Sequence, residues 1–220
     1  MRCLLDTAIL HHEKLRRYAL LVKGTIGQAV RLTSPHAWVR EQLAYFGGNI
    51  LAFDVTVGAR RNMTAVAVYS PAWPVERAAY AQQDVSDVKL TQNPDVWVLD
   101  LVTAALRNSR SDTSGAWVIA GDFNSCETFD SWRGGPRGNR EWLDRMAGLG
   151  FTECLRHHQG RITPTYRRPG KTTPNCQIDH LFVSEQLARR LSRCVTGDAE
   201  RVYGQALSDH LPIIADFAEE

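Results

Sequence analysis

The sequence lacks the features that mark membrane-spanning and secreted proteins. No apolar stretch in its 220 residues approaches the about 20 residues that a bilayer-spanning helix needs. The first residues do not follow the basic-then-apolar order of a signal peptide. The five cysteines are widely spaced and form no C-x-x-C pair, which argues against a disulfide framework or a zinc site and for free thiols. We therefore expect a cytoplasmic protein with no membrane span.

The chain also lacks a strong charge of one sign, internal repeats and low-complexity tracts. Its net charge is only +2, so the protein as a whole is not a basic nucleic-acid binder. Its apolar fraction of 44% and charged fraction of 23% are those of an ordinary globular protein. At this length we expect a single domain with a substantial core, and a monomer.

Basic residues are concentrated in one segment, residues 131–171. It holds nine basic and three acidic residues, a local net charge of +6. The basic residues are Arg133, Arg137, Arg140, Arg145, Arg156, Arg161, Arg167, Arg168 and Lys171. A polyanion such as a nucleic acid is one partner for this segment. The alternative is that these arginines only cover a solvated face.

Hydrophobic periodicity predicts an α/β (α+β) chain. Apolar and alternating runs predict strands at residues 6–10, 20–22, 28–32, 50–57, 63–69, 117–120, 178–183 and 211–217. Helical spacing predicts helices at residues 75–83, 94–107, 140–149 and 185–191. Strands that are joined by both hairpins and helices indicate a core of two sheets with helices outside.

Three short polar signatures adjoin predicted strands. Asp122 and Asn124 follow the strand at 117–120, Asp179 begins the strand at 178–183, and Asp209 and His210 precede the last strand. Oxygen ligands without cysteine favour Mg²⁺ or Mn²⁺ over Zn²⁺. A carboxylate beside a histidine fixes its tautomer and raises its pKa. These are the groups that bind a phosphate ester and activate water, so the pattern predicts a metal-dependent phosphoesterase site.

The signatures Gly-Asp-Phe-Asn, Ile-Asp-His and Ser-Asp-His, in this order, resemble the endonuclease/exonuclease/phosphatase superfamily. Its members include exonuclease III, abasic-site endonucleases, deoxyribonuclease I-like enzymes, inositol-phosphate phosphatases and sphingomyelinases. The resemblance runs from about Ile50 to Phe217. It implies a four-layered sandwich, in which two packed mixed β-sheets are flanked by helices and the site lies at one edge. It also implies Mg²⁺ or Mn²⁺ as the cofactor.

The resemblance assigns a role to each residue of the signatures. Asp122 matches the aspartate that positions or deprotonates the attacking water, and Asn124 matches the asparagine that orients nucleophile and phosphate. His210 matches the histidine that contacts the scissile phosphate. Asp209 is then its partner and a metal ligand. Asp179 matches an aspartate that orients a histidine or helps to bind metal.

Two further assignments come from the first third of the chain. Tyr69 occupies a position where family members carry a residue that touches the phosphate. The family's principal metal ligand is a glutamate on an early strand; in strict register His12 falls there, and a shift of one residue places Glu13 there. The chain begins too late for the family's first strand, which carries an asparagine. This predicts a domain that is incomplete at its N-terminus, either truncated or decayed.

Each assignment has a structural alternative. Asp122 and Asn124 are typical turn residues, Asp179 is of a kind that often pairs with an arginine, and Tyr69 is an aromatic of the kind that fills a core. For Glu13 the alternative is a solvated carboxylate at the start of a helix.

For function, the leading hypothesis is a phosphodiesterase or nuclease acting on DNA in preference to RNA. The alternatives are an inositol- or lipid-phosphate phosphatase and a decayed relative that binds a nucleic acid or a protein.

Overall fold

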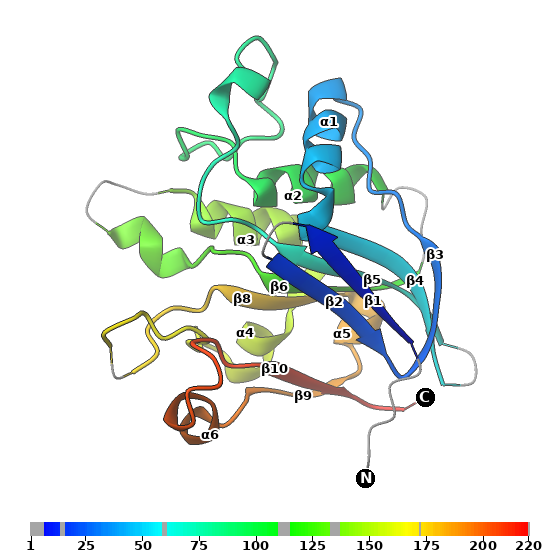
Figure 1. The fold of residues 1–220 in the computed structure, drawn as a ribbon, viewed down its shortest axis with the longest axis vertical. Helices are drawn as coiled ribbons and strands as arrows, with labels where there is room; N and C mark the ends of the chain where they lie inside the picture. The colour runs from blue at the N-terminus through cyan, green and yellow to red at the C-terminus, as the bar shows by residue number, and fades with distance from the viewer. Residues whose placement is uncertain are drawn as a thin grey trace. The chain divides into compact units, whose positions relative to one another are not determined.

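The computed structural model describes residues 7–13, 16–58, 61–109, 115–132, 137–171 and 173–219, and the side chains from residue 20 onward except residue 61. Figure 1 shows the ribbon of these residues. The chain divides into two compact units. The first comprises Met1–Lys89 and Asp95–Ile119, and the second Leu90–Pro94 and Ala120–Glu220. Among the described residues, every helix is too short or too polar to cross a membrane.

The first unit is built on antiparallel strands that the sequence largely predicts. Its strands are β1 (Thr7–Glu13), β2 (Arg16–Val22), β3 (Gly24–Ala29), β4 (Ile50–Val57), β5 (Arg61–Tyr69) and most of β6 (Ala116–Asp122). β1 and β2 form a hairpin (Figure 1). β3, β4, β5 and β6 follow one another in a sheet, in which β3 is antiparallel to β4 and β4 to β5. Val22, Val55 and Ala65 form a buried cluster in this unit, which explains the apolar positions of β2, β4 and β5.

Two helices complete the first unit: α1 (Ala37–Tyr45) and α2 (Val98–Ser109). Val98, Leu101, Val102 and the other apolar side chains of α2 are buried, as the predicted helical face requires. The helix begins at Val98 and not at Pro94. The Asp100 carboxylate accepts the backbone N–H of Trp97 at 2.8 Å, which satisfies one donor at the helix start.

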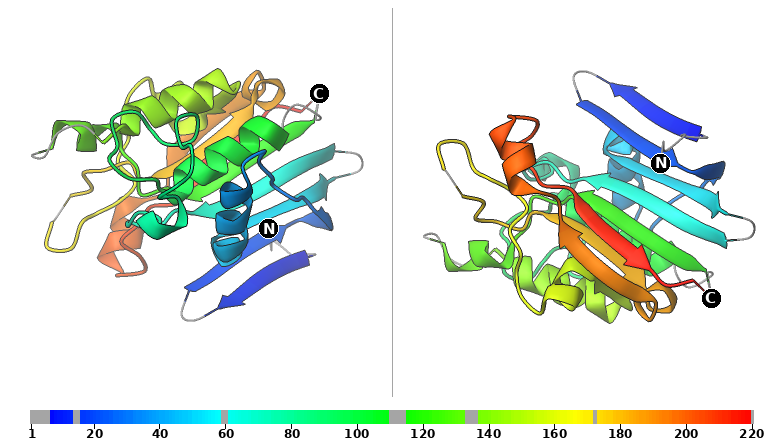
Figure 2. Two further views of the ribbon diagram at one scale, coloured as in Figure 1. Left: turned by 90° about the horizontal axis from the view of Figure 1, so that it is seen from above. Right: turned by 90° about the horizontal axis from the view of Figure 1, so that it is seen from below.

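The second unit carries the rest of the sheet and a separate strand pair. The last residues of β6 lie beside β8 (Asp179–Ser184), which pairs antiparallel with β7 (Phe151–Glu153). β9 (Leu191–Thr196) and β10 (Ile213–Phe217) form an antiparallel pair and run side by side in Figure 2. The helices are η4 (Glu127–Ser131), α3 (Asn139–Gly148), α4 (Cys154–Gln159), α5 (Glu185–Ala188) and α6 (Ala199–Gly204).

Helix α3 is held at its first turn by residues distant in sequence. Gly138, before the helix, has φ 75°, and a Cβ there would lie 3.0 Å from the Cβ of Leu90, so glycine is required. Glu141 accepts the backbone N–H of Thr91 at 2.8 Å, which ties residues 90–94 to this unit. Trp142 and Met146 of the same helix are buried.

The predicted α/β class, with a mixed sheet and flanking helices, is confirmed. Several local predictions were wrong. The helix at 75–83 is only a short 3₁₀ turn, Arg77–Ala79, because the N–H of Val75 bonds to Val96 as in an extended segment. The helix at 185–191 ends at Ala188, and β9 follows it. The helices α1, α4 and α6 and the strands β7 and β9 were not predicted. Glu13 ends a strand, opposite Arg16, so the alternative that it starts a helix is wrong.

Candidate active site

The Gly-Asp-Phe-Asn segment forms a tight turn at the end of β6. Asn124 has φ 48°, a left-handed conformation that asparagine tolerates better than most residues. Its backbone N–H donates to Asp122 Oδ1 at 2.9 Å, and its side-chain amide donates to Asp122 Oδ2 at 3.2 Å. Phe123 between them is buried, and its N–H bonds to the carbonyl of Ile178 at 2.9 Å. The turn therefore holds the Asp122 carboxylate in one orientation beside β8.

Asp179 and His210 form a hydrogen-bonded pair. His210 Nδ1 lies 3.1 and 2.9 Å from the two oxygens of Asp179. Since a carboxylate only accepts, Nδ1 carries the proton, and Nε2 is directed elsewhere. The bond to Asp179 is the main cause of a raised pKa for His210, and burial opposes it. The pair thus favours the imidazolium form, which can neutralise a phosphate oxygen.

Asp209 was expected to be the partner of His210, but it makes no hydrogen bond to the imidazole ring. Its Oδ1 is 3.9 Å from His210 Nε2, and its side chain is 57% exposed. Asp179, and not Asp209, makes the hydrogen bonds that orient the ring. Neighbouring residues of an extended segment direct their side chains apart, so the adjacent carboxylate is poorly placed to bond the imidazole.

The Asp122 carboxyl group has a pKa raised to about 6, first by burial and then by the charge of Asp179; the N–H of Asn124 and His210 oppose the shift. Two carboxylates close together resist simultaneous ionisation. A carboxylate with a pKa near the working pH is suited to accept a proton from water.

These groups line one pocket of about 490 Å³ in the second unit. Its polar lining consists of Asp122, Asp179, His180, Ser208 and His210. Its other walls are largely apolar and include Leu181, Val202, Leu207, Leu211, Pro212 and Ile213.

Thr165 and Tyr166 contact Asp179 and His210, and the sequence did not indicate either of them as a site residue. Thr165 is fully buried; its Oγ1 accepts the N–H of Asp179 at 3.2 Å, and its carbonyl accepts the N–H of Leu211 at 2.7 Å. The ring of Tyr166 lies 4.8 Å from that of His210. The segment around them looks like a polar loop, so no local pattern in the sequence indicates these contacts.

The basic segment is partly neutralised. Among its described arginines, Arg140 is paired with Asp144 and Glu127, Arg145 with Glu141, and Arg156 with Glu127.

Two other arginines, Arg167 and Arg168, directly follow Tyr166 in the sequence. The guanidinium of Arg167 is 4.2 Å from the centre of the Tyr203 ring, and its N–H bonds to the carbonyl of Asp209. Arg168 is exposed and follows directly.

The oxygen donors of Asp122, Asn124 and Asp179 fit a hard divalent cation in kind, and a cation would relieve the repulsion that raises the pKa of Asp122. Among the residues described, however, no three His, Cys, Asp or Glu side chains gather closely enough to hold a metal ion. The predicted ligand Glu13 lies in β1, where side chains fall outside the described part. Tyr69 ends β5 in the first unit and accepts a bond from Asn49 through its carbonyl. The roles of Glu13 and Tyr69 stay predictions.

The sequence matches the endonuclease/exonuclease/phosphatase family over residues 11–210. The chain belongs to this family. The resemblance predicted from the three signatures is thereby confirmed. No curated protein sequence matches the chain.

Solved structures of this family have a similar fold. A 3′ phosphatase, NExo, from Neisseria, bound to a product DNA hairpin, is 18% identical with a TM-score of 0.65; the match covers 97% of this chain and 79% of that one. An AP endonuclease from Archaeoglobus fulgidus is 16% identical with a TM-score of 0.67, over 96% and 79% of the two chains. The catalytic domain of APE2 from Xenopus laevis is 14% identical with a TM-score of 0.63, over 96% and 74%.

Proposed function

We propose that this family member is a Mg²⁺- or Mn²⁺-dependent phosphodiesterase that cleaves DNA. The observation that carries the proposal is the arrangement of Asp122, Asp179 and His210 around one pocket, with Asn124 hydrogen-bonded to Asp122. Family membership supports phosphoester hydrolysis, and several similar structures are nucleases or a DNA-bound phosphatase.

The described residues divide the chemistry between them. Asp122, with its pKa raised to about 6, accepts a proton from the attacking water near neutral pH. Asn124 shares hydrogen bonds with Asp122 and holds it toward that water. His210, kept protonated by Asp179, donates to a phosphate oxygen and stabilises the charge that develops there. A bound divalent cation would neutralise the phosphate and the two carboxylates, with Asp209 and Glu13 as further predicted ligands.

DNA is the proposed substrate because two basic residues, of which Arg168 is exposed, follow directly on Tyr166. Arg167 and Arg168 follow Tyr166, whose ring packs on His210. A duplex carries closely spaced phosphates that such groups contact. A second candidate, a phosphatase of lipid or inositol phosphates, is favoured by the apolar pocket wall formed by Leu181, Val202 and Leu207.

The test is a cleavage assay on plasmid, single-stranded, duplex and abasic-site DNA, with Mg²⁺, Mn²⁺ or EDTA. The variants are Asp122→Asn and His210→Gln, with Asp144→Asn on the exposed side of α3 as the matched control. Metal-dependent cleavage that both site variants lose and the control keeps supports the proposal. If the wild-type protein leaves every DNA intact but releases phosphate from lipid or inositol phosphates, the nuclease proposal is wrong and the second candidate is supported.

A further inference from the structure

His180 is a buried histidine next to the pair but outside the chemistry described above. Only 4% of it is exposed. Its ring lies within 6.0 Å of the rings of Phe123, Trp142 and Phe182. A polar ring in such a position costs stability unless its nitrogens are hydrogen-bonded. The partners of these nitrogens therefore indicate why a histidine is there.

One nitrogen of His180 is bonded to the segment that carries the catalytic groups. Nε2 lies 2.9 Å from the carbonyl oxygen of Ser125; since a carbonyl only accepts, Nε2 donates. Nδ1 faces Gln177 Nε2 at 3.5 Å and Glu153 Oε1 at 3.7 Å. Ser125 directly follows Asn124, so His180 connects β8 to the turn.

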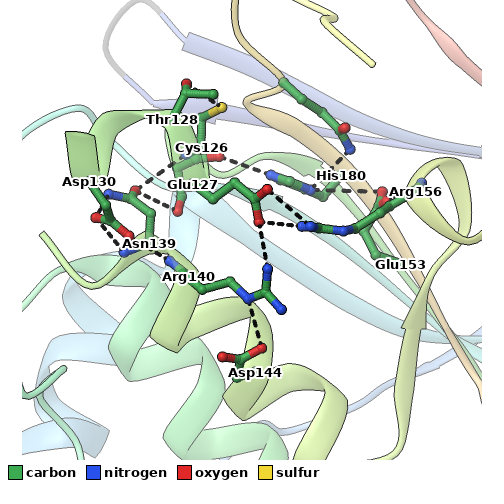
Figure 3. Close-up of polar contacts among 12 residues, drawn as sticks. Cys126, Glu127, Thr128, Asp130, Asn139, Arg140, Asp144, Glu153, Arg156 and His180 are labelled. Carbon is green, nitrogen blue, oxygen red and sulfur yellow. Dashed lines mark hydrogen bonds and ion pairs between the residues drawn. The ribbon is translucent and has the colours of Figure 1, made fainter. Parts of the chain in front are cut away.

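Asn139 holds the same segment from another element. Its Oδ1 accepts the Ser125 hydroxyl at 2.8 Å and the N–H of Cys126 at 3.3 Å. Its Nδ2 donates to Asp130 at 2.8 Å. Asp130 also accepts the backbone N–H groups of Arg137 and Asn139 at its Oδ1 and that of Arg140 at its Oδ2, so Asn139 is itself fixed at the start of α3. In Figure 3, Asn139 and His180 lie on either side of Cys126.

The turn has a physical need for such supports. Asn124 holds a left-handed backbone conformation, which few residues other than glycine and asparagine adopt. Strained backbone of this kind persists only where its surroundings hold it. Release of Ser125 and Cys126 would let the turn relax and would displace the carboxylate of Asp122.

We propose that Asn139 and His180 are positioning residues of the active site: from two sides they hold Ser125 and Cys126, and so fix the turn that carries Asp122 and Asn124. This proposal rests on the proposed phosphodiester hydrolysis, because its kinetic test measures that activity. His180 belongs to the pocket lining, but its ring nitrogens face Ser125, Gln177 and Glu153, so its proposed role is to position the turn.

The decisive comparison is between two polar replacements of the histidine. The amide of glutamine reaches about as far as the histidine Nε2, whereas that of asparagine reaches only as far as Nδ1. His180→Gln therefore keeps the donor to Ser125, and His180→Asn loses it, while both lose the ring. Phe182→Leu is the matched packing control, because it reduces the same aromatic cluster without removing a bond to the turn.

We expect His180→Asn to lower kcat by about 10–100-fold with KM changed less than about 3-fold, the size seen when supporting groups of a site are removed. His180→Gln and Phe182→Leu should keep kcat within about 5-fold of the wild type. Equal losses in His180→Asn and His180→Gln, or a loss in Phe182→Leu as large as that in His180→Asn, would overturn the proposal.

A second readout is independent of activity. We expect the amide hydrogens of Asn124 and Cys126 to exchange at least about 10-fold faster in His180→Asn and in Asn139→Ala than in wild type, at matched global stability. If amide exchange is unchanged in both variants, the proposal that Asn139 and His180 hold the turn is wrong, even if the enzyme is active. If the wild-type protein cleaves no phosphate ester, the proposed function fails, and the exchange result still decides whether the turn is held in this way. Asn139→Ala provides the test if His180→Asn does not fold.

Discussion

Replacement of Asp122 by asparagine should stabilise the metal-free protein while abolishing its activity. The Asp122 carboxyl group has a pKa of about 6 against an ordinary value of 3.8. Its ionised form is thus unfavourable in the folded state. An amide removes the charge, and its oxygen still accepts the N–H of Asn124. The same burial that suits the carboxylate to accept a proton therefore lowers stability.

The size of this gain in stability, and the pH range in which it develops, follow from the raised pKa of Asp122. The folded-state pKa lies above the unfolded one, so the folded protein binds more protons between about pH 4 and 6 and loses stability as the pH rises through that window. A shift of about 2 units, at 1.36 kcal/mol each, corresponds to about 3 kcal/mol above pH 6. We expect Asp122→Asn to raise the unfolding free energy by about 1–3 kcal/mol at pH 7.5, and to leave it unchanged below pH 4.

Urea unfolding of both proteins in EDTA, from pH 3.5 to 8, measures this difference. Asp144→Asn, which removes an exposed carboxylate on α3, should change the unfolding free energy by less than about 0.5 kcal/mol at every pH. Equal stability of Asp122→Asn and wild type at pH 7.5, or a gain already complete at pH 3.5, would refute the reasoning, because the carboxylate would then be unperturbed by burial and by Asp179.

Four further outcomes follow. Asp179→Asn should lower the pKa of His210 toward 6.5, so that activity declines with rising pH from a lower pH than in wild type; coincident pH–rate profiles would contradict this. Saturating Mg²⁺ should raise the Tm of wild type but not of Asp122→Asn, as scanning calorimetry can check; equal shifts would place the ion elsewhere. Arg168→Ala should reduce the slope of log Kd against log salt for duplex DNA by about 1, whereas an unchanged slope would remove Arg168 from the interface. Asp130→Ala should cost about 1–3 kcal/mol in urea unfolding, because the N-terminal N–H groups of α3 lose their acceptor; a cost below about 0.5 kcal/mol would show that water replaces it.

Elements with a strong local pattern were predictable from the sequence. The helices α2 and α3 and the hairpin of β4 and β5 have apolar residues at the period of their own structure. Burial in α2 goes beyond that period, because every residue from Val98 to Leu106 is buried. Boundaries were less predictable. The helix expected from Pro94 begins at Val98, and the strand β9 follows a helix that is shorter than its pattern suggested.

The residues of the candidate site could be predicted from the sequence, but the hydrogen-bond partners of those residues could not. Asp122 and Asn124 are close in sequence, so their hydrogen bonds lie within one turn. Asp179 and His210 are 31 positions apart, and the sequence suggested the adjacent Asp209 as the partner. Thr165 shows no local signal, because its contacts join three segments of the chain.

The family, the α/β class and the residue types of the site can be predicted from the sequence alone, because short motifs and hydrophobic periodicity are properties of neighbouring residues. The folded structure was needed to find that Asp179 orients His210, that burial raises the pKa of Asp122, and that Asn139 and His180 contact the turn from two elements. Hydrogen bonds and desolvation depend on distance and on exclusion of water. Both are set where distant segments of the folded chain meet.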